Sequence, residues 1–470
     1  MQRLTPLATA FLDAEDADPQ ASLAIGSFAV FAGPAPSFAE ITAAIGSRLP
    51  LIPRYRQRLR AVPFRLAAPA WVDDPDFDLR RHVHLEPVPP PGGRQQLAEL
   101  FSRLMTRRMD RDRPLWDYWF CPGLPGGRWG LVSKLHHSMA DGISGSQLYH
   151  LVLDASPGAA PPLVDDWLPR PPSGLSFTAQ ALVELARTPG RQLAGGLRAA
   201  GSPLLLASRA GRFGQGLLTM TGALRPVRPT SLAGPLCGQR RYAWTSCGFG
   251  ELQPVRHRFG VTVNDVAMAA ITGGFRRLLI ARGEQPAATS LRSLVPVSTR
   301  EAGAEQVQDN RISLLLPYLP VELPDAADRL RTIAGRLAAL RRAHEADAGA
   351  DLTSLAAASP FLPVTLGIRL GWRLPQHQVA TVTTNVPGPR ATLYCLGRPL
   401  LEILPYVPIA DRLRTGVAIF SYRRGLTFGI TADREAVPDV EVLAAGIRDS
   451  LTELRELAEP ATGLRSAGRA

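Results

Sequence analysis

Short apolar runs of strand length alternate with longer segments of helical spacing in two stretches of this chain, residues 1–154 and 241–470. Apolar runs of four to eight residues indicate strands, whereas apolar spacings of three and four indicate amphipathic helices. Strands are predicted at residues 23–32, 128–137, 291–297, 311–317, 378–384, 415–421 and 425–431. Helices are predicted at residues 37–48, 94–109, 143–154, 263–280, 325–346 and 439–457. Mixed elements in two halves of similar size indicate an α/β or α+β protein with two related layers.

The composition changes between the two stretches, over residues 155–240. A proline-rich run, Pro-Arg-Pro-Pro-Ser-Gly, is followed up to Leu224 by Leu and Ala mixed with Arg, Gly and Pro. We interpret this segment as a crossover linker with one or two amphipathic helices. Such a helix either lies on a membrane surface or packs against its own protein, and the pattern leaves both open. The predicted organisation is an N-terminal subdomain at 1–154, this linker, and a C-terminal subdomain at 241–470.

Basic residues outnumber acidic residues by 53 to 41, which gives a net charge of +12. All of these cations are arginines except Lys134. Guanidinium groups pair with phosphate and carboxylate in a bidentate manner, so the balance favours nucleic acid, an anionic membrane surface or a phosphorylated cofactor as partner. Aromatic residues make up only 7% of the chain and do not alternate with arginine runs. This argues against a nucleic-acid surface.

No segment of the sequence has the continuous apolar character of a membrane-spanning helix. The longest uncharged stretches, residues 21–39 and 352–368, each contain two prolines. The N-terminus carries acidic residues where a secretion signal needs its apolar segment. The four cysteines show no zinc or redox spacing, which favours a reducing compartment. We therefore expect a cytoplasmic protein that is soluble or rests on a membrane without crossing it.

Two adjacent histidines, His136 and His137, end the predicted strand at 128–137, and Asp141 and Gly142 follow where the chain turns. Adjacent strand residues point to opposite faces, so only one of the histidines is expected to face a given cleft. A histidine near its ordinary pKa of about 6.5 suits general-base catalysis at neutral pH. A carboxylate nearby orients such a ring or pairs with an arginine. No phosphate-binding loop, dinucleotide motif or nucleophile elbow occurs in the chain.

The segment from His136 to Gly142 resembles the His-His-x-x-x-Asp-Gly motif of acyltransferases built on the chloramphenicol acetyltransferase fold, which include peptide-synthetase condensation domains and plant acyltransferases. Further blocks are similar to the bacterial wax ester synthase/diacylglycerol acyltransferase family. These are Arg-Pro-Leu-Trp at 113–116, Val-Asn-Asp-Val-Ala-Met at 263–268 and Asn-Val-Pro-Gly-Pro at 385–389, with weaker matches at 295–300, at 309–313 and in the opening with Leu4, Phe11, Leu12 and Glu15. On this resemblance the chain is identified as a member of that family.

Two positions depart from the family pattern. Residues 22–26 read Ser-Leu-Ala-Ile-Gly where the family commonly has Met-His-Val-Gly, and Asp309 stands where the family more often has Gly. The missing histidine puts in doubt any role of the segment 22–26 in substrate selection.

The resemblance implies two chloramphenicol acetyltransferase-like subdomains, each a mixed β-sheet with flanking helices, and an active site at their interface. It implies acyl transfer from acyl-CoA, as co-substrate, to a long-chain alcohol or diacylglycerol, with formation of wax ester or triacylglycerol. His137 would be the general base and Asp141 would hold its loop through an arginine. No metal, permanently bound cofactor or covalent intermediate is expected.

The oxyanion of this reaction needs hydrogen-bond donors, which Asn264, a threonine hydroxyl at 383 or 384, or backbone amides could supply. The expected contacts to substrate or oxyanion are His136, Gly142, Asn264, Thr383, Thr384 and Asn385. The residues expected to shape the site are Pro114, Leu115, Trp116, Asp265 and Gly388.

Several of these residues have an alternative interpretation. Asn264 could equally cap the helix at 263–280, Trp116 could be an ordinary core aromatic, and Glu15 could be a first-turn helix carboxylate. Two rival functions stay open: an acyltransferase of the same fold that acts on a polyketide, sugar or amine, and a non-catalytic lipid-binding relative.

A lipid product and a basic surface favour peripheral attachment to the inner face of a membrane or to lipid droplets. The arginines of segment 186–225, which stand among apolar residues, make it the predicted contact. No nucleic-acid partner is expected, and the sequence assigns no oligomeric state.

Overall fold

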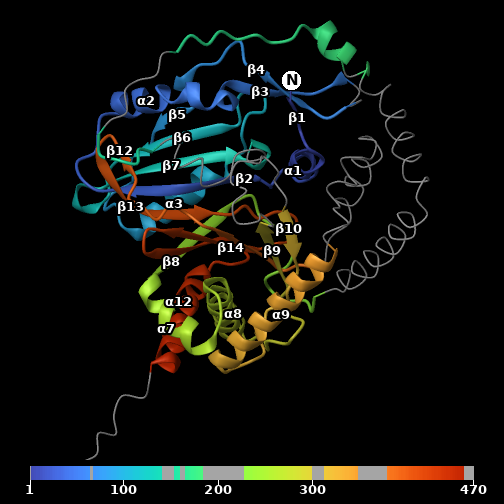
Figure 1. Cartoon of the computed structure of the whole chain (residues 1–470), viewed down its shortest axis with the longest axis vertical. Helices are drawn as coiled ribbons and strands as arrows, with labels where there is room; N and C mark the ends of the chain where they lie inside the picture. Colours follow the sequence, from blue (N-terminus) through green and yellow to red (C-terminus); the bar gives the residue numbers. More distant parts are fainter. Residues whose placement is uncertain are drawn as a thin grey trace, which may run out of the picture.

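Two six-stranded mixed sheets, each flanked by helices, form two lobes in the computed structural model (Figure 1). The structure describes residues 2–63, 67–139, 153–158, 165–180, 182–183, 227–298, 312–347 and 378–459. The strands of the first sheet lie in the order β12 (Tyr394–Cys395), β13 (Arg398–Tyr406), β2 (Ala24–Phe31), β7 (Trp129–His136), β6 (Trp116–Cys121) and β5 (Val83–Leu85). Those of the second lie in the order β10 (Ile312–Leu315), β9 (Ser293–Ser298), β11 (Thr381–Val386), β14 (Thr415–Tyr422), β15 (Gly425–Asp433) and β8 (Arg240–Gly248).

Three helices of the first lobe flank its sheet: α1 (Pro6–Ala17), α2 (Phe38–Gly46) and α3 (Arg94–Thr106). α2 begins with a capping box in which the Ser37 and Glu40 side chains bond each other's backbone N–H groups. α3 buries Leu97, Phe101 and Leu104 in a cluster that includes residues of β2, β7 and β8. α3 therefore packs against both sheets. A small sheet of β1 (Gln2–Arg3), β4 (Ala70–Asp73) and β3 (Gln57–Arg60) completes this lobe.

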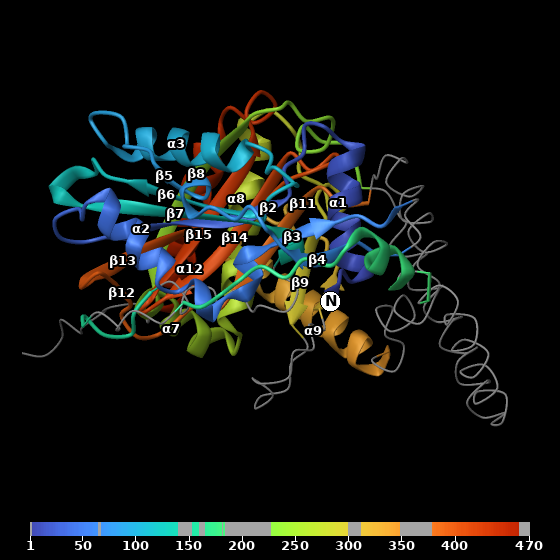
Figure 2. The same cartoon turned by 90° about the horizontal axis from the view of Figure 1, so that it is seen from above.

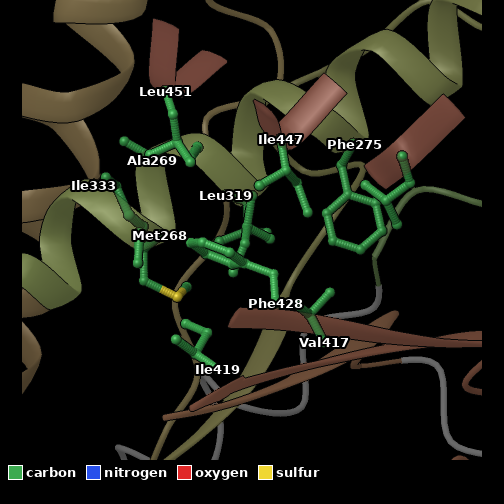
Figure 3. Close-up of a cluster of buried hydrophobic side chains, with 14 of the residues drawn as sticks. Met268, Ala269, Phe275, Leu319, Ile333, Val417, Ile419, Phe428, Ile447 and Leu451 are labelled. Carbon is green, nitrogen blue, oxygen red and sulfur yellow. The ribbon is translucent and has the colours of Figure 1, made fainter. Parts of the chain in front are cut away.

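Four helices cover one face of the second sheet: α7 (Phe249–Phe259), α8 (Val263–Ala281), α9 (Ala326–Asp347) and α12 (Val440–Ala458). α8 is buried on nearly all sides because α12, α9 and the sheet surround it. Figure 3 shows Met268 and Phe275 of α8 between Val417 and Phe428 of the sheet and Ile447 of α12. A helix that is apolar all round is expected in such a position.

β12 and β13 follow β11 of the second lobe in sequence but belong to the first sheet. There β12 pairs with β13, and β13 pairs with β2. The subdomain limits at 154 and 241 stay a prediction. That prediction did not include the hairpin of β12 and β13, which joins the sheet of the other lobe. The two sheets pack tightly where Gly429 of β15 meets Pro405 of β13. A Cβ atom at Gly429 would overlap the Pro405 carbonyl oxygen, so glycine is required at this contact.

The predicted mixed α/β class is confirmed, and so are most of the predicted elements. The helix predicted at 143–154 lies largely outside the described residues. The sequence interpretation did not predict α1, β6, β8 or β13. Within the described part of the chain, no helix combines the length and apolar character needed to cross a membrane.

Candidate active site

His137 lies just beyond the last residue of β7, in a short 3₁₀ turn, His137–Met139, rather than in the strand itself. Its backbone N–H donates to the Leu23 carbonyl oxygen at 3.1 Å. The Phe11 ring of α1 stacks on the imidazole, with ring centroids 3.9 Å apart and planes inclined by 24°. Burial and, to a smaller extent, the neighbouring His136 lower the pKa of His137 to about 4. The ring is therefore neutral at physiological pH and can accept a proton.

His136 is fully buried beside this base and contacts a separate set of partners. The Ser138 backbone N–H donates to its Nδ1 at 3.1 Å, and the Ser138 hydroxyl lies 2.7 Å from the same atom. Because Nδ1 accepts a hydrogen bond, the neutral ring carries its proton on Nε2. Nε2 lies 3.4 Å from the Glu15 carboxylate. His136 therefore links β7 to α1 and has other partners than His137, but strand alternation does not account for this because His137 lies beyond the strand.

Glu15 is a buried carboxylate in the last turn of α1, so its interpretation as a first-turn helix carboxylate is wrong. It accepts hydrogen bonds from the Leu23 backbone N–H at 2.6 Å and from Arg111 at 3.1 Å. Burial alone would raise its pKa, but the His136 contact and these donors together lower the pKa to about 2. Glu15 is thus charged and holds α1 against the strand end that carries the histidines.

Asn264 does not cap α8, contrary to one of the two interpretations of the sequence. Thr262 is the cap: its hydroxyl accepts from the Asp265 N–H, and Asp265 accepts from the Thr262 N–H at 3.0 Å. Asn264 is one residue into the helix, where its Oδ1 accepts a hydrogen bond from Asn385 Nδ2 at 2.9 Å. The structure thus brings together two predicted site residues from blocks 121 positions apart. Because Asn264 uses its side-chain oxygen in this bond, its side-chain N–H groups remain available to donate to other partners.

Thr383 and Thr384 of β11 point to opposite faces of the second sheet. Thr383 pairs in register with Val417, which packs in the helix-covered core, and its hydroxyl accepts from Ser293 at 2.9 Å. Thr384 pairs with Ala418, which packs on the other face. Of the two hydroxyls, that of Thr384 lies on the face turned away from the helices.

That second face of β11 and β14 is the one that meets the first lobe. Val382 and Ala418 form a small apolar cluster with Val407, the residue that follows β13. Further along the same face, Phe420 and Tyr422 belong to the core cluster of the first lobe. Thr384 therefore lies on the face between the lobes.

The histidines end their strand at this same junction. In the first sheet Tyr406 of β13 lies opposite Gly26 of β2, and two residues away Ala24 lies opposite His136. The C-terminal end of β13, from which the chain continues into the second lobe, therefore lies at the same edge of the sheet as the histidines at the end of β7. Figures 1 and 2 both place α1 of the first lobe and β9 of the second towards the same end of the molecule. The histidine end of β7 and the face that carries Thr384 thus both lie at the junction of the two sheets.

The Pro-Leu-Trp block lies beside the histidines, on the neighbouring strand of the same sheet. Leu115 accepts a hydrogen bond from the His136 N–H at 3.0 Å, and Trp116, which is fully buried, donates from Nε1 to the Tyr55 carbonyl at 2.8 Å. Gly388 lies against β14, where a Cβ atom would overlap the Ser421 carbonyl and the Phe420 ring. Neither block carries a titratable group, and their role in shaping the site stays a prediction.

Asp141 and Gly142 lie outside the described residues, as does the segment 186–225. Phe11, Glu15 and Ser138 contact the histidines but are absent from the predicted site. The signal for two of them is a four-residue spacing, which puts Phe11 and Glu15 on one face of a helix. Among the residues that the structure describes, no cluster of three or more His, Cys, Asp or Glu side chains could hold a metal ion.

The family model of the wax ester synthase/diacylglycerol acyltransferase catalytic domain matches residues 4–267 of the chain, and that of the C-terminal domain of the same family matches residues 308–455. The protein named "Probable diacyglycerol O-acyltransferase tgs1" from Mycobacterium tuberculosis strain H37Rv is 42% identical over 459 residues, which cover 97% of this chain and 96% of that protein.

Two solved structures share the fold. The wax ester synthase/diacylglycerol acyltransferase from Marinobacter aquaeolei VT8 matches with a TM-score of 0.67 at 25% identity, over 97% of this chain and all of its own. The first condensation domain of the calcium-dependent antibiotic synthetase matches with a TM-score of 0.58 at 16% identity over 97% of each chain, a likeness of fold alone. With both family domains in order and a two-lobed acyltransferase fold around the paired histidines, the chain belongs to the wax ester synthase/diacylglycerol acyltransferase family.

Proposed function

We propose that the protein transfers a fatty acyl group from acyl-CoA to the hydroxyl of a long-chain alcohol or diacylglycerol, forming wax ester or triacylglycerol. The observation that carries the proposal is the state of His137, a histidine kept neutral at the junction of two lobes. Family membership and the name of the mycobacterial relative support acyl transfer to an alcohol or diacylglycerol. The proposed reaction needs neither a metal nor a permanently bound cofactor.

In the proposed reaction a ring nitrogen of His137 removes the proton of the acceptor hydroxyl as that oxygen attacks the thioester carbonyl. The new C–O bond gives a tetrahedral oxyanion beside the imidazolium. When the oxyanion collapses, the C–S bond breaks and the CoA thiolate takes the proton from His137, so the base is regenerated. A thiol with a pKa near 8.5 is a good leaving group and needs little acid assistance. Base catalysis of this kind contributes about a hundred- to ten-thousand-fold.

Donors for the oxyanion come from the second lobe. Thr384 carries the hydroxyl that lies on the face between the lobes, whereas the Thr383 hydroxyl faces the helices and bonds Ser293. Asn264 stands at the N-terminus of α8, where its amide donors and the first-turn N–H groups are suited to negative charge. We assign Thr384 and Asn264 as the proposed donors, with Asn385 orienting Asn264 through their hydrogen bond.

The acceptor and the product of this reaction are lipids, so we further propose that the protein works at a membrane or droplet surface. The residues just before the predicted contact segment 186–225 support this. Leu175 is 88% exposed and Leu182 is 50% exposed, seven positions apart along a helical stretch whose Phe177 is anchored in the protein. Apolar side chains at this spacing form one exposed stripe.

The reaction is tested with purified protein, mixed acyl-CoA donors and a panel of acceptors that includes fatty alcohols, diacylglycerol, a sugar and an amine. Mass spectrometry of the products and release of free CoA are the readouts. We expect wax ester or triacylglycerol, with a loss of at least a hundredfold in rate for His137→Ala. The matched control is His257→Ala, because His257 is exposed on α7.

Three outcomes would contradict the proposal. Full rate in His137→Ala excludes this base, acylation of the sugar or amine alone identifies a different acyltransferase, and no acyl-CoA consumption with any acceptor favours a lipid-binding protein.

A further inference from the structure

We propose that α1 is a positioning element for the base, in which Phe11 holds the plane of the His137 ring and Glu15, one turn later, fixes the neighbouring His136. This inference rests on the proposed function, since it concerns how His137 is kept ready to accept a proton. Phe11 and Glu15 are four residues apart, so both side chains project from the same face of the helix. That face meets the turn that contains His137.

The Phe11 contact is a face-to-face stack, with ring centroids 3.9 Å apart and planes 24° from parallel. Such a stack covers one face of the imidazole but not the ring edges, where the nitrogens lie, and the ring also has a hydrogen bond with its own backbone. The stack also restricts rotation about the bond between Cβ and the ring, which is otherwise broad for histidine. Phe11 therefore sets the direction in which the nitrogens of His137 point.

Glu15 anchors the helix that carries Phe11. Its carboxylate accepts from the Leu23 N–H, and the carbonyl oxygen of the same Leu23 accepts from the His137 N–H. One residue thus links the carboxylate of α1 to the backbone of the base. The contact of Glu15 with His136 Nε2 at 3.4 Å adds a second link, through the histidine next in sequence. Any movement of α1 relative to β7 must break these contacts first.

The titratable groups around His137 come from two elements in the described structure. His136 belongs to β7 and lowers the pKa of His137, while Glu15 of α1 faces His136 and is itself paired with Arg111 and Arg108. Phe11 carries no charge and excludes water from the ring. Its removal admits water, which stabilises the imidazolium and raises the pKa of His137 from about 4 towards 6.5.

The test compares Phe11→Ala and Phe11→Leu with Phe11→Tyr, which keeps an aromatic ring. For Phe11→Ala and Phe11→Leu we expect kcat to fall about tenfold or more, because a displaced base reacts slowly, with KM for acyl-CoA changed less than about threefold. For Phe11→Ala the acid limb of kcat/KM, which reports the free base, moves up by about half a unit or more. Phe11→Tyr restores most of kcat and the wild-type pH profile.

The matched control is Leu12→Ala, which removes a buried side chain of the same helix that packs in the core. It loses stability but keeps the wild-type pH profile. If Leu12→Ala moves the acid limb as far as Phe11→Ala, or if Phe11→Ala leaves both kcat and the limb unchanged, Phe11 has no positioning role.

A titration by NMR separates this inference from the proposed function. With ¹³C-labelled histidine, the His137 signal is identified by its loss in His137→Gln, and its pKa is followed in wild type and Phe11→Ala without any turnover. A rise of the His137 pKa in Phe11→Ala supports the inference even if no acyl transfer is found. An unchanged pKa together with unchanged ring dynamics overturns it.

Discussion

At the scale of single residues, strand register places Thr383 and Thr384 on opposite faces of the second sheet, although the sequence predicts the same role for both. We expect Thr384→Val to lower kcat about a hundredfold with little change in stability, because it removes a donor on the face between the lobes. Thr383→Val should instead lower stability and leave kcat nearly unchanged. It deprives the buried Ser293 hydroxyl of its acceptor and should cost about 1–3 kcal/mol of unfolding free energy, with kcat within about threefold of wild type.

Steady-state kinetics and urea unfolding of the two variants give the readouts. Each variant is the control for the other, since both replace a hydroxyl by a methyl group in the same strand. A larger loss of kcat in Thr383→Val than in Thr384→Val would show that the oxyanion is bound from the other face.

The residues of the site differ in how far the sequence could place them. His137 and Asn264 stand in recognisable blocks, so local pattern was sufficient to select them. Phe11 and Glu15 stand in the weaker opening match, and nothing near them in sequence indicates that their helix packs against a strand end about 120 residues later. Such a contact depends on tertiary packing, which a local pattern does not encode.

At the scale of secondary-structure elements, the long and strongly periodic segments were predictable. α3 and α8 have clear helical spacing, and β7, β14 and β15 are apolar runs of ordinary strand length. β13 was missed because its sequence, Arg-Pro-Leu-Leu-Glu-Ile-Leu-Pro-Tyr, contains two prolines and two charged residues, and its pairing shifts register between Leu400 and Glu402. Its partner β2 lies about 370 residues earlier in the chain, which no local pattern indicates.

Lys134 connects β7 to the end of α3 and gives an element-scale prediction. Its Nζ is buried and donates to the carbonyl oxygens of Leu104 and Arg107, in the last turn of the helix and just after it. Burial lowers its pKa to about 8, so at pH 8.5 much of the amine is uncharged and chemically reactive. Protection of this lysine from an amine reagent therefore depends on burial and not on charge.

We expect an amine-reactive ester at pH 8.5 to leave Lys134 unmodified in the native protein and to modify it fully in guanidinium chloride. Peptide mass spectrometry gives the site without ambiguity, because the chain contains one lysine. Intermediate denaturant should show labelling together with the loss of helical circular dichroism. Labelling of the native protein as fast as the denatured protein would mean that the end of α3 opens freely.

At the scale of the whole molecule, the site depends on how the two sheets are held against each other. The base comes from β7 of the first sheet, and the proposed oxyanion donors come from β11 and α8 of the second lobe. Arg240 at the start of β8 ties the lobes together: it donates to the Gln20 carbonyl of the first lobe at 3.0 Å and lies 3.8 Å from Asp433 of β15. The sequence predicted two layers, but not that β13 passes from one to the other.

The tight contact of the two sheets at Gly429 and Pro405 gives the last prediction. Gly429→Ala places a methyl group against the Pro405 carbonyl and the Tyr242 hydroxyl, which itself donates to that carbonyl at 2.8 Å. The backbones have to move apart, which should cost about 1–3 kcal/mol. Because the separation carries His137 away from Thr384, kcat should fall at least about tenfold in protein that is still folded.

The control for this change is Gly250→Ala, at an exposed position in the first turn of α7 where an added Cβ meets nothing within 4 Å. It should change stability by less than about 0.5 kcal/mol and leave kcat at the wild-type value. Urea unfolding and steady-state kinetics below the transition measure both variants. If Gly429→Ala lost stability but retained kcat, the distance between the two sheets would not limit the reaction, and the catalytic groups would have to come from one lobe alone.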